Sequence, residues 1–287
     1  MTSTPKKPRL VVVGSGAMGT GIAQVSYDAG FHVTLVDPSP RALDAAQSRI
    51  INASARAIAN EPGSRQSGEL HTSGSYDGLE LADLVIEAVP EIPEVKLAVL
   101  KEISSLASAS VVIASNTSTI PITQLGQVVD VAERFIGMHF FNPVPKMKLV
   151  EIIRGQHTSE PTASLATRFV EQGLGKTALV VSDRPGFVVN RLLIPYLISA
   201  ARMLDAGYCS AETIDNGMQL GCSMPIGPIR LADYIGLDVL CQAADSIHAE
   251  TQDPSCIVPD NIRALVQAGK LGRKSGQGFF SYTPINS

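Results

Sequence analysis

The segment from Arg9 to Asp37 constrains the fold of this chain more than any other part of its sequence. It contains a short aliphatic run, a glycine-rich turn, a stretch whose apolar residues have helical spacing, and a second aliphatic run. Largely β-branched runs of this length are typical of parallel strands that are buried on both faces. The segment therefore predicts one strand–turn–helix–strand unit of an α/β protein. Its parts are Arg9–Val13, Gly14–Gly19, Thr20–Ala29 and Phe31–Val36.

Each glycine of the turn has its own task in dinucleotide binding. Gly14 permits the tight turn, Gly16 lets backbone N–H groups approach a pyrophosphate, and Gly19 lets the helix pack closely on the strand. The N-terminus of the helix then presents its positive dipole end to the phosphates. The turn predicts an NAD site whose residues are Gly14, Gly16, Ala17, Met18, Gly19 and Asp37.

Asp37 ends the second predicted strand, about 20 residues past the turn. A carboxylate at this point accepts hydrogen bonds from the adenosine ribose and repels a 2′-phosphate, so it favours NAD over NADP. Arg41 leaves NADP as an open alternative. The alternative interpretation is that the glycine turn has only a structural role, as in an unrelated α/β protein that binds no dinucleotide.

The alternation of strands and helices continues to about residue 182. The pattern predicts an α/β fold with a Rossmann-type, doubly wound and mostly parallel sheet. Residues 61–78 are rich in Gly and Ser and predict a loop or a frayed hairpin tip. Ligands of open α/β sheets bind beyond the carboxyl ends of the strands, so Asn116, Ser118 and His139 are expected at the cofactor crevice. Further strands are expected over 84–89, 110–115, 135–139, 149–153 and 179–181, and helices over 41–59 and 94–106.

Strand signals disappear after Pro185. The change predicts an NAD-binding Rossmann-like domain over residues 1–184 and a helical substrate and dimerisation domain over residues 185–287. Because helices with broad apolar faces in a small domain often pack against a second copy, we expect a homodimer. The expected helices are 187–204 with a kink at Pro195, 211–220 with Ser210 as N-cap, 227–234, 237–248 and 260–268.

Composition excludes several other classes. The net charge of −4 argues against a nucleic-acid binder that works by bulk charge, and it gives no reason to concentrate at an anionic membrane. No apolar run reaches the roughly 20 residues of a membrane span, and the first residues carry no signal-peptide core. The four cysteines have no metal-site spacing, so we expect no metal, buried reduced thiols and a cytoplasmic protein.

Among the five histidines, His139 stands at a strand end beside the predicted nicotinamide. Oxidation of an alcohol by a nicotinamide needs a base that takes the hydroxyl proton as hydride leaves carbon, and imidazole suits that task. Such a base needs an orienting partner on its other nitrogen. Glu151, which is expected near the end of the next strand, is the nearest carboxylate candidate. A structural histidine and a surface glutamate are the alternative.

Several longer motifs resemble the signature of the L-3-hydroxyacyl-CoA dehydrogenase family, in the same order and over about residues 9–282. The resemblance implies hydride transfer between NAD and C3 of a 3-hydroxyacyl thioester, with CoA as the first choice of carrier, in fatty acid metabolism. The motifs are Ser115–Ser118, His139–Pro145, Lys148–Glu151, Pro185–Arg191, Gly227-Pro228 with Leu231–Asp238, and Gly272–Phe280.

The resemblance also implies roles for single residues. His139 would be the general base in oxidation and the acid in reduction, and Glu151 would orient it and stabilise its charge. Ser118 and Asn190 would hold the hydroxyl or the thioester carbonyl. Further dinucleotide contacts would come from Glu91, Lys96, Asn116, Asn142 and Lys274.

One segment departs from the family pattern. Family members usually carry a longer, lysine-rich helical hairpin between the positions of Asp37 and Leu84, where it grips coenzyme A. The stretch here is short and has no lysine, although Arg49 and Arg56 share a helix face that could meet a phosphate or remain solvated. A carrier-protein thioester, which presents phosphopantetheine without the adenine nucleotide, is therefore an alternative substrate.

Two further alternatives are open. Related dehydrogenases act on free hydroxy acids, but they typically differ at the pair occupied here by Phe140 and Phe141. A non-catalytic, cofactor-binding relative need not keep the catalytic residues, and this chain has His139, Glu151, Ser118 and Asn190.

Overall fold

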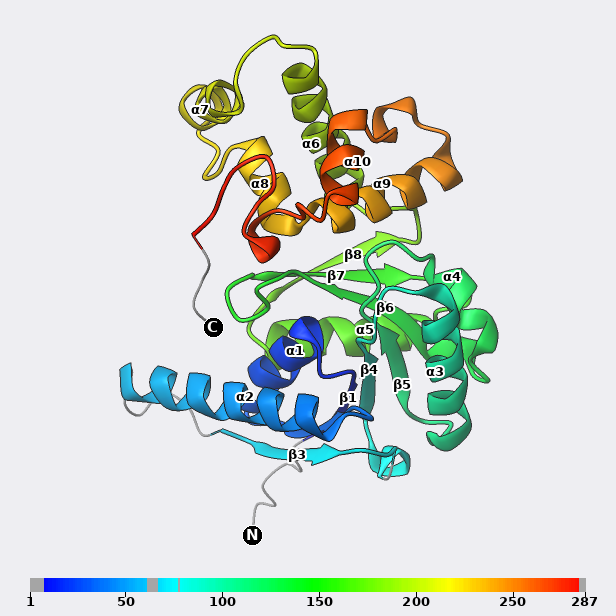
Figure 1. Ribbon diagram of the computed structural model, residues 1–287. Helices are drawn as coiled ribbons and strands as arrows, with labels where there is room; N and C mark the ends of the chain where they lie inside the picture. The colour runs from blue at the N-terminus through cyan, green and yellow to red at the C-terminus, as the bar shows by residue number, and fades with distance from the viewer. Residues whose placement is uncertain (1–7, 61–66, 77, 284–287) are drawn as a thin grey trace. The chain divides into compact units, whose positions relative to one another are not determined.

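The computed structural model describes residues 8–60, 67–76 and 78–283. The chain divides into two compact units, residues 1–184 and residues 185–287. The first unit is built on one sheet, and the described part of the second is helical (Figure 1).

The sheet of the first unit has the order β3-β2-β1-β4-β5-β6-β7-β8. Its first six strands follow the order of a doubly wound dinucleotide-binding sheet, in which the direction of winding reverses between β1 and β4. All neighbouring strands are parallel except β6 and β7. The strands are β1 Arg9–Val13, β2 His32–Val36, β3 Glu69–Ser73, β4 Leu84–Glu87, β5 Val112–Ser115, β6 Phe135–Phe140, β7 Leu149–Arg154 and β8 Thr177–Ser182.

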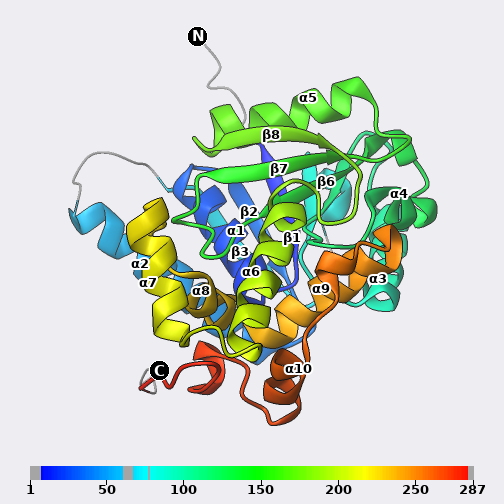
Figure 2. The same cartoon turned by 90° about the horizontal axis from the view of Figure 1, so that it is seen from above.

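Helices cover both faces of this sheet. Right-handed crossovers on either side of the winding reversal place α1 and α2 on one face and α3 on the other (Figures 1 and 2). Ile22 of α1 and Ile50 of α2 are fully buried against Leu10 and Val12 of β1 in one apolar cluster. The helices are α1 Ala17–Asp28, α2 Pro40–Asn60, α3 Pro93–Leu106, α4 Ile122–Leu125 and α5 Glu160–Arg168.

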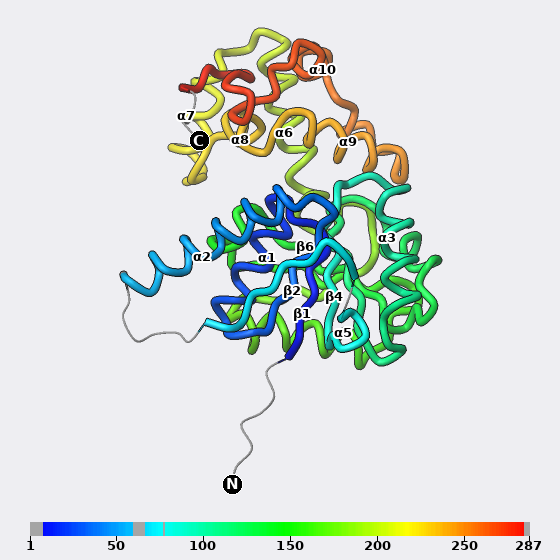
Figure 3. The backbone as a smooth tube through the Cα atoms, turned by 60° about the horizontal axis from the view of Figure 1, so that its bottom comes forward, coloured from blue at the N-terminus to red at the C-terminus, as the bar shows by residue number. Residues whose placement is uncertain are grey.

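The expectation of a loop over residues 61–78 is wrong for Glu69–Ser73, which form the edge strand β3 parallel to β2. An edge strand with partly exposed side chains needs no apolar run, and Leu70 alone of these residues packs on the core. The rest of the segment includes residues 61–66 and 77, which lie outside the described residues. The preceding helix α2 extends past the sheet, and its C-terminal half is largely exposed (Figure 3).

The second unit packs around α6 Val189–Asp205, which contains Pro195 as expected. Ile194, Leu197 and Ile198 of this helix are buried against residues of α8 and α9. The expected N-cap is confirmed, because the side chain of Ser210 accepts a hydrogen bond from the backbone N–H of Thr213. The remaining helices are α7 Ala211–Cys222, α8 Pro228–Ile235, α9 Leu237–Thr251 and α10 Asp260–Gln267.

The expectation of buried thiols holds for only two of the four cysteines. Cys241 and Cys256 are buried, whereas Cys209 is half-buried and Cys222 is exposed at the end of α7. All four are free thiols.

Asp215 caps α8 from the neighbouring helix α7. Its carboxylate accepts hydrogen bonds from the backbone N–H groups of Ile229 (2.8 Å) and Arg230 (3.1 Å), in the first turn of α8. Because Gly227 at the N-cap offers no side-chain acceptor, these two N–H groups depend on Asp215.

We predict that Asp215→Ala lowers the free energy of unfolding by about 1–3 kcal/mol, measured by urea unfolding. An unchanged unfolding midpoint would contradict this role.

Candidate active site

The glycine turn between β1 and α1 has the geometry of a phosphate cradle. Gly14 has φ +102°, and a Cβ there would lie 2.7 Å from the carbonyl oxygen of Ala88. A Cβ at Gly19 would overlap the carbonyl oxygen of Gly14, so no side chain fits at the closest approach of helix and turn. A Cβ at Gly16 would meet nothing within 4 Å, which leaves open space in front of the N-terminus of α1.

Asp37 is held in the ionised state at the end of β2. Its carboxylate accepts hydrogen bonds from Ser15 N and Ser15 Oγ, both at 2.9 Å, and from Ser39 N at 2.9 Å. Partial burial raises the pKa of Asp37, but these hydrogen bonds outweigh burial and leave the pKa below its ordinary value. The open cradle at Gly16 and the carboxylate beyond it fit the pyrophosphate and ribose of NAD.

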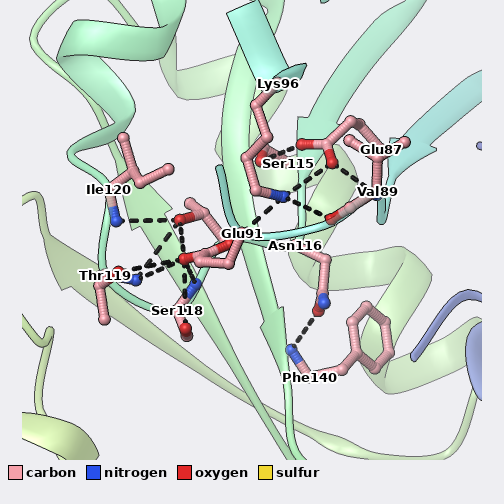
Figure 4. Close-up of polar contacts among 11 residues, drawn as sticks. Glu87, Val89, Glu91, Lys96, Ser115, Asn116, Ser118, Thr119, Ile120 and Phe140 are labelled. Atoms are coloured by element: carbon pink, nitrogen blue, oxygen red, sulfur yellow. Dashed lines mark hydrogen bonds and ion pairs between the residues drawn. The ribbon is translucent and has the colours of Figure 1, made fainter. Parts of the chain in front are cut away.

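A buried network of charges links the ends of β4 and β5 (Figure 4). The ammonium group of Lys96 lies 2.7 Å from Glu87 Oε1 and 3.3 Å from Glu91 Oε2, and it also donates to the carbonyl oxygen of Val89. Lys96 and Glu87 are almost completely buried. The other oxygen of Glu87 accepts the hydroxyl of Ser115, the last residue of β5, at 2.5 Å.

Glu91 joins this network to the loop after β5. Its Oε1 accepts hydrogen bonds from Thr117 Oγ1 (2.6 Å), Ser118 N (2.7 Å), Ser118 Oγ (3.2 Å) and Thr119 N (3.0 Å). Burial raises the pKa of Glu91, but the charge of Lys96 and these hydrogen bonds hold it below its ordinary value. Three of the predicted site residues, Glu91, Lys96 and Ser118, therefore share one polar network.

Asn116 ties the end of β5 to the end of β6. Its Oδ1 accepts the backbone N–H of Phe140 at 2.9 Å, as Figure 4 shows. Phe140 directly follows His139, so this hydrogen bond fixes the end of β6 beside the loop that carries Ser118.

His139 and Glu151 form a buried pair across β6 and β7. They are directly opposite each other in the antiparallel register, and His139 Nδ1 lies 2.8 Å from Glu151 Oε2. Glu151 is third in β7, so the expectation that it lies near the end of its strand is wrong. Because β7 runs against β6, its beginning meets the end of β6, and the expected partners come together.

The loop after β6 contains Asn142, which is exposed. Lys176 holds this loop by donating to the carbonyl oxygens of Val144 (2.7 Å) and Met147 (2.6 Å). The ring of Phe141 lies against the imidazole of His139, with 4.5 Å between the ring centroids.

Ala17 and Met18 are the first two residues of α1, and two further predicted site residues belong to the second unit. Asn190 is half-buried in the first turn of α6. Lys274 is half-exposed and forms an ion pair with Asp238, with 2.6 Å between Nζ and Oδ1.

Sequence reasoning did not single out Glu87 and gave no role to Ser115, although the motif Ser115–Ser118 contains it; the side chains of both residues anchor the buried network. A charged residue inside the apolar run 84–89 was the available signal, because a carboxylate at such a position needs a buried partner.

Comparison with known proteins identifies the family. The family model "3-hydroxyacyl-CoA dehydrogenase, NAD binding domain" matches residues 9–184, and the model of the C-terminal domain matches residues 186–282. The chain belongs to the 3-hydroxyacyl-CoA dehydrogenase family. Its membership confirms the resemblance, the Rossmann-type fold with a helical C-terminal part, and NAD as the cofactor. The chain is thus an NAD-dependent oxidoreductase.

Individual relatives match along nearly their whole length. A 3-hydroxybutyryl-CoA dehydrogenase of Mycobacterium tuberculosis is 41% identical over 280 residues, and the match covers 96% of this chain and 98% of the relative. A mitochondrial hydroxyacyl-coenzyme A dehydrogenase of Sus scrofa is 37% identical, with 95% and 90% covered. The crystal structure of (S)-3-hydroxybutyryl-CoA dehydrogenase from Ralstonia eutropha superposes with a TM-score of 0.91 at 41% identity, covering 97% of this chain and all of that one.

The mycobacterial relative and this chain are both covered almost completely, so the two chains have similar lengths. Relative to that enzyme, the chain is not short. The absence of lysine between Asp37 and Leu84 remains a feature of its sequence.

The residues that the structure describes, 8–60, 67–76 and 78–283, lack two features of other protein classes. None of their helices is long and apolar enough to cross a membrane. They hold no group of three or more His, Cys, Asp or Glu side chains arranged for a metal ion.

Gly16 and Gly19 of the turn allow a matched test, because a side chain has room at Gly16 but not at Gly19. We predict that Gly19→Ala lowers the free energy of unfolding by about 1–3 kcal/mol, because its methyl group overlaps the Gly14 carbonyl. Gly16→Ala has room for its methyl group in the protein but fills space needed by a pyrophosphate. It is expected to raise the Kd of NADH roughly tenfold or more while changing stability less than Gly19→Ala. Urea unfolding and NADH fluorescence titration measure both effects, and wild-type affinity in Gly16→Ala would contradict the cradle.

Proposed function

We propose that the chain oxidises and forms the C3 hydroxyl of short 3-hydroxyacyl-CoA thioesters, with His139 as the general acid–base. The observation that carries this proposal is the buried 2.8 Å contact between His139 at the end of β6 and Glu151 near the start of β7, on the sheet edge where the glycine turn after β1 also lies. NAD, when bound, supplies the hydride acceptor for C3. The protein's own side chains are assigned to proton transfer and to holding the substrate oxygens.

His139 moves the proton of the substrate hydroxyl. Because Nδ1 faces the carboxylate of Glu151, Nε2 is the ring atom assigned to the substrate proton. In oxidation Nε2 accepts this proton, and in reduction it returns it to the oxygen at C3. Glu151 holds the ring in one orientation and stabilises the imidazolium that forms.

Ser118 and Asn190 are assigned to the substrate oxygens. Ser118 lies on the loop after β5, where Glu91 fixes its backbone and hydroxyl. Asn190 lies in the first turn of α6, in the second unit. The cradle residues Gly14, Gly16, Ala17, Met18 and Gly19, with Asp37, Glu91, Lys96, Asn116, Asn142 and Lys274, are assigned to the dinucleotide.

The choice of CoA rests on the relatives, two of which are named 3-hydroxybutyryl-CoA dehydrogenases at about 41% identity. Arg49 and Arg56 are exposed on α2 and offer cations for a CoA phosphate. Nothing among the described contacts favours a carrier-bound thioester. Residues 1–184 are proposed as the NAD-binding domain and residues 185–287 as the substrate and dimerisation domain of a cytoplasmic enzyme.

With NADH, the protein is expected to reduce acetoacetyl-CoA, and His139→Gln is expected to lower kcat by about 10²–10⁴-fold because the proton donor is gone. NADH oxidation at 340 nm measures the rate. NADH affinity of the variant should match the wild type, which excludes loss of the cofactor site. Absence of turnover on short and medium 3-ketoacyl thioesters, both CoA-bound and carrier-bound, would refute the proposed function.

The second unit exposes large apolar side chains, including Leu192 (72% exposed) and Leu220 (86% exposed). A second copy of the chain is proposed to bury them in a homodimer interface. Light scattering on a sizing column should give twice the mass of the 30.3 kDa chain. Leu192→Asp with Leu220→Asp should shift the mass toward one copy. A wild-type mass of a single chain would refute the homodimer.

A further inference from the structure

The buried network at the ends of β4 and β5 contains an excess of one negative charge. Two carboxylates, Glu87 and Glu91, share the single ammonium group of Lys96. Glu87 is completely buried, and its two oxygens accept three hydrogen bonds, from Lys96, the N–H of Val89 and the hydroxyl of Ser115. Such a pair costs desolvation free energy, and a hydrophobic pair of similar volume is often as stable. Stability alone therefore gives a weak reason for these charges.

The geometry gives Glu87 a second effect. Its short contact with Lys96, together with the Val89 carbonyl, fixes the ammonium group in one position. From that position Lys96 faces one oxygen of Glu91 at 3.3 Å, while the other oxygen receives the loop of Thr117, Ser118 and Thr119 (Figure 4). One oxygen of Glu91 is thus fixed by the buried ammonium group of Lys96, and its other oxygen fixes the loop that carries Ser118.

We infer that Glu87 is a positioning residue for the reaction, because through Lys96 it fixes Glu91, which in turn fixes the backbone and hydroxyl of Ser118. This inference rests on the proposed function, in which Ser118 holds a substrate oxygen. Glu87 contacts neither substrate nor cofactor in this scheme and acts only through Lys96 and Glu91. A displacement of Ser118 weakens the positioning of the reacting oxygen more than it weakens nucleotide binding.

The test removes the charge of Glu87 and separates positioning from stability. Glu87→Gln keeps the side-chain shape and is expected to lower kcat for acetoacetyl-CoA at least about tenfold, with a much smaller change in the Kd of NADH. Glu87→Gln combined with Lys96→Met leaves neither partner of the pair as a lone buried charge, so its Tm should recover toward the wild type. Its kcat, measured at saturating NADH because Lys96 is also assigned to the dinucleotide, should stay low because Glu91 has lost its cation.

Thr158→Val is the matched control. Thr158 is buried in the same unit and donates to the carbonyl oxygen of Phe135 at the start of β6, the end away from His139. Its variant is expected to lose stability and keep kcat. Ser115→Ala removes one hydrogen bond of Glu87 without changing any charge, and it is expected to lower kcat about threefold.

The outcomes separate clearly. Low kcat in the double variant despite recovered Tm, with normal kcat in Thr158→Val, supports the inference. Recovery of kcat together with Tm, or wild-type kcat in Glu87→Gln, overturns it. If the Glu87 variants do not fold, Ser115→Ala decides: reduced kcat supports positioning, and unchanged kcat overturns it. A wild-type protein without activity on acyl thioesters refutes the proposed function itself, which is a distinct result.

Discussion

The antiparallel pairing of β7 with β6 is the constraint on which the proposed catalytic pair, His139 and Glu151, depends. In a parallel sheet, neighbouring strands all bring their carboxyl ends to one edge, and His139 reaches that edge on β6. A parallel neighbour of β6 would place its own last residues at that edge. Because β7 runs antiparallel to β6, its first residues lie at that edge instead, and Glu151 is directly opposite His139 in the register. The strand pairing itself therefore brings the two side chains of the proposed acid–base pair together.

Buried charge organises the other half of the edge. Glu87, Lys96 and Glu91 connect the ends of β4 and β5, while Asn116 connects β5 to β6. A buried carboxylate or ammonium group is tolerated only when it is paired, so these contacts leave few alternative arrangements of the loop that carries Ser118. The glycine turn after β1 lies at the same edge, where no side chain obstructs the space in front of Gly16.

Much of this arrangement could be predicted from the sequence, because buried parallel strands and a glycine turn leave strong local patterns. The polar edge strand Glu69–Ser73 left no such pattern, since its neighbour β2 and not an apolar face specifies it. The partnership of His139 with Glu151 was predicted, but the direction of β7 was not, because strand direction depends on pairing across the sheet. Glu87 escaped notice because its role depends on Lys96 and Ser115, nine and 28 positions away along the chain.

The central claim is that His139 and Glu151 act as one unit, and a double-mutant cycle tests it most directly. The rates of acetoacetyl-CoA reduction by His139→Gln, Glu151→Gln and the double variant are compared with that of the wild type at saturating NADH. If Glu151 works only through His139, the double variant is no slower than His139→Gln alone. If the two losses multiply in the double variant, the residues contribute independently and the account is contradicted.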